Sequence, residues 1–337
     1  MDKFKKIGLT ALAGSLACAS VAQAGSVSGS WVLTYTGGDA DEQTGQAWGN
    51  KTGLVFSMDD VELDNGWTAG WAMGTGNAMA YSSSQISIDM GDAGKLVYDD
   101  GCGTCYGSGT KDNVTPFVFE EADDGLNYGA VEMPAMGNAF YYVAPQTMGT
   151  DLTIGLAPSG GRADDGLTGG AGEGNTDEMS VTLSNSTAVD GLTMTAAMFE
   201  ASGGDNTAQR TRTSTTGGGD IDSLTGALSY AIGGLSLGYQ KTEVVYQHGS
   251  NYATDAWAVS YNVNDNLSIG YTSVETEEQK SSATNVTAEY TGIGMTYTMG
   301  PMAIKYVRNE GDNVNGLTTA SATRDDEHQE LMVSITF

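Results

Sequence analysis

The chain has 337 residues, of which 42 are Asp or Glu and 14 are Lys or Arg, so its formal net charge is −28 at pH 7. Phosphate backbones would repel so acidic a protein, which excludes nucleic acid as a partner. No stretch after residue 24 holds 18 consecutive apolar residues, which excludes membrane-spanning helices. Long solvated loops and a water-filled interior would spread this charge, whereas a compact soluble fold would be destabilised by self-repulsion.

The first 24 residues have the organisation of a secretory signal peptide. Three lysines precede an apolar run that ends at Ala22-Gln-Ala24, the A-x-A pattern of a cleavage site. We therefore expect cleavage between Ala24 and Gly25. Residues 1–24 would be removed, and residues 25–337 would form the exported domain.

The apolar run also contains Cys18, which offers a lipoprotein anchor as an alternative. Ser15 stands where a lipid-anchoring motif requires an aliphatic residue. Cleavage at the A-x-A site would remove Cys18, so we favour the simple signal peptide.

The first half of the exported chain contains segments in which apolar and small polar residues alternate, which is the period of a β-strand. In the first segment, Val27, Trp31 and Tyr35 share one face and serines occupy the other. Asn65-Gly66 and Gly91-Asp92 have the chemistry of hairpin turns. The clear segments are 27–35, 54–58, 67–73, 86–90 and 96–98, and weaker ones follow at 139–144, 151–157, 178–185 and 192–201.

In the second half, strand pairs joined by short turns alternate with long polar stretches. The short turns lie at Gly233-Gly234, Asn264-Asp-Asn266 and Gly300-Pro301. Tight turns at one end and long loops at the other are typical of outer-membrane barrels. The expected long polar loops are 241–254, 273–284 and 308–327.

One apolar pattern in this half changes phase. Ala288 and Tyr290 have the opposite parity to the apolar residues from Ile293 onward. We therefore expect a β-bulge near Gly292 or Gly294, where glycine makes a bulge least costly.

The last strand has the pattern of a barrel-closing strand. Leu331, Val333, Ile335 and Phe337 share one face and place an aromatic residue at the carboxy terminus. This alternation matches lipid-facing strands, and the strand is free to pair with the first one. Taken alone, the segment would also fit the last strand of a soluble β protein.

The length of residues 25–337 accommodates 16 tilted strands with a turn or loop after each. The predicted fold is therefore all-β, a transmembrane antiparallel up-and-down barrel of about 16 strands. The expected inward residues are mainly Ser, Thr, Gly, Gln and Ala, and a barrel of this size is wide enough to hold an aqueous channel.

Four segments carry a resemblance to a known family, namely Lys5–Gly14, Val27–Ser30, Glu120–Gly125 and the terminal Phe337. They resemble the general porins of Gram-negative bacteria, and the signal peptide is similar to those of marine alphaproteobacterial porins. The resemblance implies a homotrimer in the outer membrane, in contact with lipid and lipopolysaccharide. It also implies assembly through the C-terminal strand by the barrel-assembly machinery, and passive diffusion of small hydrophilic solutes.

The family also implies a long third loop that folds inward after the fifth strand, and residues 99–138 lie where this loop would be. Its expected pore-facing carboxylates are Glu120, Glu121, Asp123 and Asp124, with a solvated loop surface as the alternative. Strand parity turns Lys95 and Lys305 toward them. The expected wall residues are Lys95, Asp89, Gln240 and Lys305.

The chain departs from the family in its arginines. General porins oppose the loop acids with a ladder of arginines, whereas the five arginines here fall mostly in expected loops, at 162, 210, 212, 308 and 324. Without that ladder the lumen is negative, which predicts a preference for cations.

Cys102 and Cys105 lie in the same loop. In an oxidising compartment we expect them to form a small disulfide. A redox role is the alternative, although no thioredoxin-like pattern surrounds the motif. A zinc site is disfavoured, because it would need these thiols to be joined by the distant His248 and His328. We therefore expect no metal site.

We expect no cofactor, although several acidic clusters have the oxygen ligands that Ca²⁺ or Mg²⁺ prefer and could bridge lipopolysaccharide phosphates. None matches a known calcium loop, and solvated loop surfaces are the favoured explanation. The clusters are 39–42, 59–60, 164–165, 177–178 and 325–327.

Two other functions compete with a channel. A secreted or surface-attached acidic calcium-binding β protein, of the adhesin or surface-layer type, would explain the acidity and the glycine content. It would not explain the terminal aromatic strand or the asymmetry of the turns. An enzyme is disfavoured, because spacing provides neither His248 nor His328 with a nucleophile or acid partner.

Overall fold

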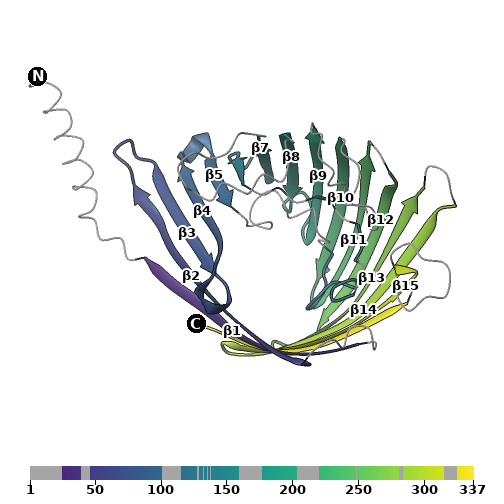
Figure 1. Cartoon of the computed structure of the whole chain (residues 1–337). Helices are drawn as coiled ribbons and strands as arrows, with labels where there is room; N and C mark the ends of the chain where they lie inside the picture. The colour runs from purple at the N-terminus through teal and green to yellow at the C-terminus, as the bar shows by residue number, and fades with distance from the viewer. Residues whose placement is uncertain are drawn as a thin grey trace, which may run out of the picture.

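The protein is a closed antiparallel β-barrel in which each strand pairs with its neighbours in the chain and β1 pairs with β16 (Figure 1). The computed structural model describes residues 25–38, 46–100, 115–126, 129–131, 133–134, 136, 138–158, 177–202, 220–247, 249–280, 284–314 and 325–337. Sixteen strands are present within these ranges, so the predicted up-and-down barrel is confirmed.

The strands of the first half overlap the expected segments, although β2 and β4 begin at least five residues before the expected starts at 54 and 86. They are β1 (Ser26–Gly38), β2 (Trp48–Glu62), β3 (Thr68–Thr75), β4 (Tyr81–Asp89), β5 (Lys95–Asp100), β6 (Ala139–Val143), β7 (Thr150–Ala157) and β8 (Asp177–Asn185). Two 3-10 turns, η1 (Asn77–Met79) and η2 (Gly91–Ala93), lie between them. In the described part of the chain, no helix has the length and apolar character needed to cross a membrane.

The strands of the second half are longer than the apolar pattern suggested. They are β9 (Leu192–Ser202), β10 (Ile221–Ile232), β11 (Leu235–Tyr246), β12 (Asn251–Asn262), β13 (Leu267–Gln279), β14 (Val286–Met299), β15 (Met302–Asp312) and β16 (Asp326–Thr336). The three stretches expected to be long loops are therefore partly strand, and the connections shrink to 247–250, 280–285 and 313–325.

The physical reason is that, in these parts of the strands, the apolar side chains lie on the inner face and the polar side chains lie on the outer face. Glu243 and Glu275 point outward, where polar residues lie above the apolar belt, while Val244 and Val274 point inward and are buried. Side chains still alternate between the two faces, but the outward positions are now polar. A strand prediction that relies on outward apolar residues therefore assigns these segments to loops.

The predicted bulge in β14 is wrong for the same reason. The strand pairs with β13 and β15 in continuous register through Gly292 and Gly294. Ala288 and Tyr290 face inward and are completely buried, whereas Ile293 faces outward and is exposed. The phase change thus marks a move of the apolar residues from the outer face to the inner face, with no extra residue in the strand.

The last strand closes the barrel as predicted. Leu331, Val333 and Ile335 pair with Tyr35, Leu33 and Trp31 of β1. The N–H of Phe337 donates to the carbonyl of Gly29 at 3.0 Å, and the N–H of Gly29 donates to the carbonyl of Phe337 at 2.9 Å. Phe337 is 72% exposed and continues the outward apolar face.

The outer surface carries a belt of exposed apolar side chains contributed by strands all around the barrel. Examples are Trp31, Trp71, Leu228, Trp257 and Ile293. The expected signal peptide, residues 1–24 with the cleavage residue Ala24, lies outside the described residues, which begin at Gly25.

Val333 and Ser334 provide a matched test of the two faces of the closing strand. We expect Val333→Arg to destabilise the barrel in lipid vesicles by about 2–4 kcal/mol, because it places a charge on the lipid face. Ser334→Arg, on the inner face, should cost clearly less. Equilibrium unfolding in urea measures both, and equal losses would contradict the assigned orientation.

Candidate functional site in the lumen

The third loop, between β5 and β6, lies against the inner wall of the barrel. Thr115 and Pro116 lie at Gly238 of β11, Val118 lies at Gly270 of β13, and Ala122 lies at Gly292 of β14. Gly125 reaches His328 of β16. The loop then turns back, because Gly129 contacts Tyr290 of β14 and Val131 contacts Thr254 of β12.

A row of inward glycines makes room for the outgoing half of this loop. A Cβ at Gly238 would come within 2.4 Å of Pro116, and one at Gly270 would come within 2.4 Å of a Val118 methyl group. A Cβ at Gly292 would come within 3.1 Å of the Ala122 backbone. We call Gly238, Gly270, Gly292 and Gly294 the glycine track. Close approach of two backbones explains why glycine occupies these strand positions.

Wall side chains hold the loop backbone through hydrogen bonds. Asn309 of β15 donates from Nδ2 to the carbonyls of Glu121 and Asp124, at 2.7 and 2.9 Å, and is completely buried. Thr296 donates to the carbonyl of Val118 at 3.1 Å, and Tyr290 to that of Gly129 at 3.2 Å. A buried carbonyl without a donor is costly, so these bonds fix the path of the loop.

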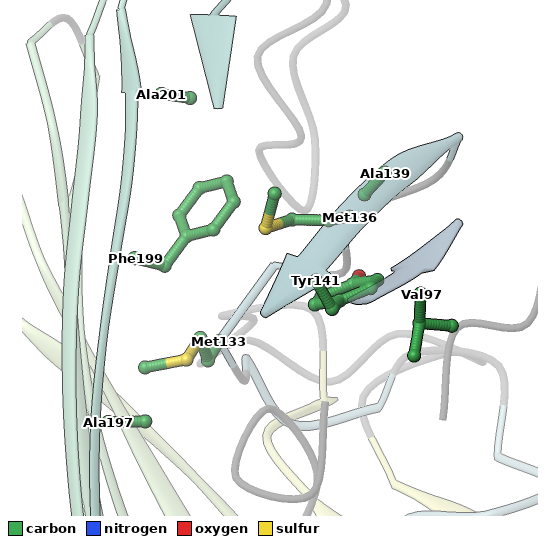
Figure 2. Close-up of a cluster of buried hydrophobic side chains, with 8 residues drawn as sticks. All are labelled: Val97, Met133, Met136, Ala139, Tyr141, Ala197, Phe199 and Ala201. Carbon is green, nitrogen blue, oxygen red and sulfur yellow. The ribbon is translucent and has the colours of Figure 1, made fainter. Parts of the chain in front are cut away.

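The returning half of the loop is anchored by apolar packing. Figure 2 shows Met133 and Met136 lying between Phe199 of β9 and Tyr141 of β6, with Val97 of β5 nearby. A second cluster joins Ala122 to inward residues of β12, β13 and β14, including Tyr290. Much of the inner wall is therefore apolar and covered by the loop, and the expectation of a uniformly small and polar inner face is wrong here.

The four loop acids occupy different environments. Glu121 is only 8% exposed, and its role as a pore-facing carboxylate stays a prediction. Asp123 accepts a hydrogen bond from the N–H of Ala130 at 2.6 Å. Asp124 is exposed and accepts one from the N–H of Glu121 at 2.9 Å. Glu120 is half-buried. The bonds of Asp123 and Asp124 to backbone N–H groups stabilise the fold of the loop itself.

The pKa of Glu120 is raised from an ordinary 4.5 to about 7. Burial is the largest cause, and the nearby Glu330 and Asp124 carboxylates act in the same direction. His328 and Lys305 act in the opposite direction. Loss of solvation and like charges both disfavour the ionised form.

The expected wall residues are also only partly accessible. Lys95 lies on the same face as the inward Val97, and Asp89 pairs with it across β4 and β5. Lys305 faces the loop, with its ammonium 5.2 Å from the centre of the Phe119 ring. Gln240 lies on the inner face of β11 and is 3% exposed, because the loop covers this stretch of the wall near Gly238. Its role in the pore wall stays a prediction.

Sequence reasoning missed Lys51, which lies on the inner face of β2 opposite Val32. Strand parity could have found it, because Leu54 and Phe56 face outward and Lys51 has the other parity. Arg308 was expected in a loop but lies in β15. Its outward side chain forms ion pairs with Glu310 at 2.8 Å and Glu327 at 3.1 Å.

Sequence reasoning also missed the surroundings of His328. Its ring lies under Gly125, which has a φ of +77°, and a Cβ there would come within 2.3 to 2.5 Å of ring atoms. Glu120 and Glu330 lie beside it. Cys102, Cys105 and His248 lie outside the described residues, and so do Arg162, Arg210, Arg212 and Arg324.

No family model matches this chain, and no curated protein matches it. Solved structures do share its architecture. OmpF of Salmonella typhi in complex with daunomycin aligns with a TM-score of 0.66 at 13% identity, over 93% of this chain and 97% of that one. The chain shares the porin fold.

Two further structures show the same likeness. The anion-selective porin from Comamonas acidovorans aligns with a TM-score of 0.62 at 14% identity, over 93% of this chain and 99% of that one. The trimer form of OmpT from Vibrio cholerae aligns with a TM-score of 0.63 at 10% identity, over the same shares. At these identities the likeness concerns the fold.

Gly238 provides a test of the glycine track. We expect Gly238→Ala to displace the outgoing half of the loop and to cost about 1–3 kcal/mol, because the new methyl group overlaps the rigid Pro116 ring. Limited proteolysis of the folded protein should then cut within residues 115–131 faster. Gly53→Ala, on the inner face of β2 away from the loop, is the control. Unchanged cleavage in Gly238→Ala would contradict the docking.

Glu120 provides a test of pH dependence. Its pKa is raised when the loop is docked, so the docked state binds more protons than a released loop would. Docking should therefore strengthen as the pH falls from about 7 toward 4.5 and weaken as it rises. Hydrogen exchange of residues 115–126, followed with EDTA present, measures this.

Glu120→Gln should remove most of this pH dependence while leaving His328, Glu330, Asp124 and Lys305 in place. The pH dependence that remains in the variant belongs to those neighbours. An unchanged profile would show that Glu120 does not titrate in this range.

Proposed function

We propose that this protein is an outer-membrane porin that forms a water-filled channel for passive diffusion of small hydrophilic solutes and ions, with a preference for cations. The observation that carries the proposal is the closed barrel with an exposed apolar outer belt and a loop held inside the lumen. Barrels of this strand number leave an aqueous path, and an inward loop sets its width.

The preference for cations rests on the groups that face inward. Lys51, Lys95 and Lys305 are the inward lysines of the described strands. The inward carboxylates outnumber them, and Glu120, Asp123 and Asp124 of the loop add to the excess. Fixed negative charge in a narrow path concentrates cations and repels anions. The inward strand carboxylates are Asp59, Glu62, Asp89, Asp99, Asp151, Glu178, Glu278, Asp326 and Glu330.

The proposal includes export by the signal peptide, insertion into the outer membrane of a Gram-negative bacterium through the C-terminal strand and the barrel-assembly machinery, and a homotrimeric assembly. The fold likeness to OmpT of Vibrio cholerae, an outer membrane protein in a trimer form, supports the last point. Exposed acids at the loop end of the barrel would meet lipopolysaccharide, with Ca²⁺ or Mg²⁺ between the two anionic partners.

The apolar belt favours this function over a secreted adhesin. Trp31, Leu228 and Ile293 are exposed on separate strands, and a protein that works in water rarely exposes so extended an apolar surface. We also propose that the protein is not an enzyme, because the inward groups fit the lining of a channel.

Conductance in planar bilayers tests the channel and its selectivity together. We expect large steady steps in groups of three, and a reversal potential in a salt gradient that indicates cation preference. Glu178→Gln, on the inner face of β8, should reduce the cation preference. Glu200→Gln, which neutralises an adjacent carboxylate on the outer face of β9, should leave it unchanged.

The outcomes separate the parts of the proposal. Insertion without conductance would overturn the channel. Conductance with an anion preference would retain the channel and overturn the account of its electrostatics. Single steps in place of triplets would overturn the trimer.

A further inference from the structure

We propose that Glu120, His328 and Glu330 form a binding site for a divalent transition-metal ion of the Zn²⁺ type, which links the third loop to β16. One ligand atom from each residue lies within 4.8 Å of the other two. His328 Nε2 and Glu330 Oε2 are 3.8 Å apart. The site goes beyond the proposed channel function, because its existence does not depend on conduction.

The donor set fits this class of ion. One imidazole nitrogen and two carboxylate oxygens are ligands that Zn²⁺ accepts, and a fourth position would remain for water. Tetrahedral ligands at about 2.0–2.1 Å from Zn²⁺ lie roughly 3.4 Å from one another, so the three side chains need only a small inward rotation. Ca²⁺ and Mg²⁺ favour oxygen donors throughout, which the imidazole does not provide.

The backbone arrangement holds the three residues toward one another. His328 and Glu330 are two residues apart on β16, so both project from the same inner face. On the loop side, Asn309 binds the carbonyls of Glu121 and Asp124, which fixes the segment that carries Glu120. Gly125 packs against the imidazole ring and restricts its position.

The charges at this point also favour a cation. Glu120 and Glu330 are like-charged when both are ionised, and they face each other across the junction of loop and wall. A divalent ion would replace this repulsion with two attractive contacts. Metal binding would therefore fasten the tip of the loop to β16 and reduce the negative charge at the narrowed part of the lumen.

Calorimetry on the full chain, refolded in detergent and freed of metal with EDTA, tests the site. Zn²⁺ is titrated with Mg²⁺ in excess, so that exposed carboxylates are already occupied. We expect one equivalent of Zn²⁺ per chain to bind. Glu120→Gln, His328→Gln and Glu330→Gln should each weaken that binding about tenfold or more, because each removes one ligand.

Glu327→Gln is the matched control. It neutralises a carboxylate next to His328 on the same strand but on the opposite, outward face. It should leave the affinity unchanged. Heat-dependent mobility on gels establishes that each variant keeps a folded barrel. If His328→Gln does not fold, the Zn²⁺ affinities of Glu330→Gln and Glu120→Gln decide whether the site exists.

Co²⁺ binding supplies an independent readout, because its visible absorption reports nitrogen coordination. We expect a spectrum in the native protein that His328→Gln loses. Zn²⁺ binding that persists in all three ligand variants, or that Glu327→Gln weakens equally, would overturn the site. A protein that binds Zn²⁺ in this way but does not conduct would retain the site and overturn only the channel.

Discussion

Every strand of this barrel depends on the pairing of its first and last strands. In hydrocarbon an unpaired edge would leave a row of N–H and C=O groups without partners, and only a closed sheet avoids this. The register between β1 and β16, ending in the reciprocal hydrogen bonds of Gly29 and Phe337, satisfies both edges at once. Closure also fixes the wall positions against which the third loop packs.

The loop is built as a second layer inside this wall. Its outgoing half uses glycine to bring two backbones close together, and its returning half uses Met133 and Met136 to fill apolar gaps. Asn309 provides donors for carbonyls that the irregular backbone cannot pair by itself. Close packing and satisfied carbonyls give the loop one defined position, which the proposed channel would need for a fixed width.

The barrel could be predicted from the sequence because its signals are local. Two-residue alternation, Gly and Asn turns and the terminal aromatic strand each occupy a few neighbouring residues, as at Val27–Tyr35 and Leu331–Phe337. The loop could be placed by its length and by resemblance. The wall positions that the loop contacts could not be predicted. In the sequence alone, Gly238 and Gly292 only weaken a strand pattern, and their purpose becomes clear when the loop lies against them.

Sequence patterns also could not bring together Glu120, His328 and Glu330. Two distant histidines argued against a metal site, yet the neighbours of His328 are carboxylates, one of them more than 200 residues earlier in the chain. Tyr290 was interpreted as evidence for a bulge, because pattern alone does not distinguish an apolar residue facing lipid from one facing a loop. The neighbours of His328 and the packing of Tyr290 are contacts that exist only after folding.

The position of Asn309 and His328 near the end of the chain has a consequence for the order of assembly. The loop begins after β5, but the strands that hold Glu121, Asp124 and Gly125 are β15 and β16, which lie far from β5 in the sequence. Until those strands are in place, the carbonyls of Glu121 and Asp124 lack the Asn309 donor, and Gly125 has no His328 ring against which to pack. The docked position of the loop therefore depends on the seam strands, and a barrel that has not closed is also one whose lumen does not yet have its final width.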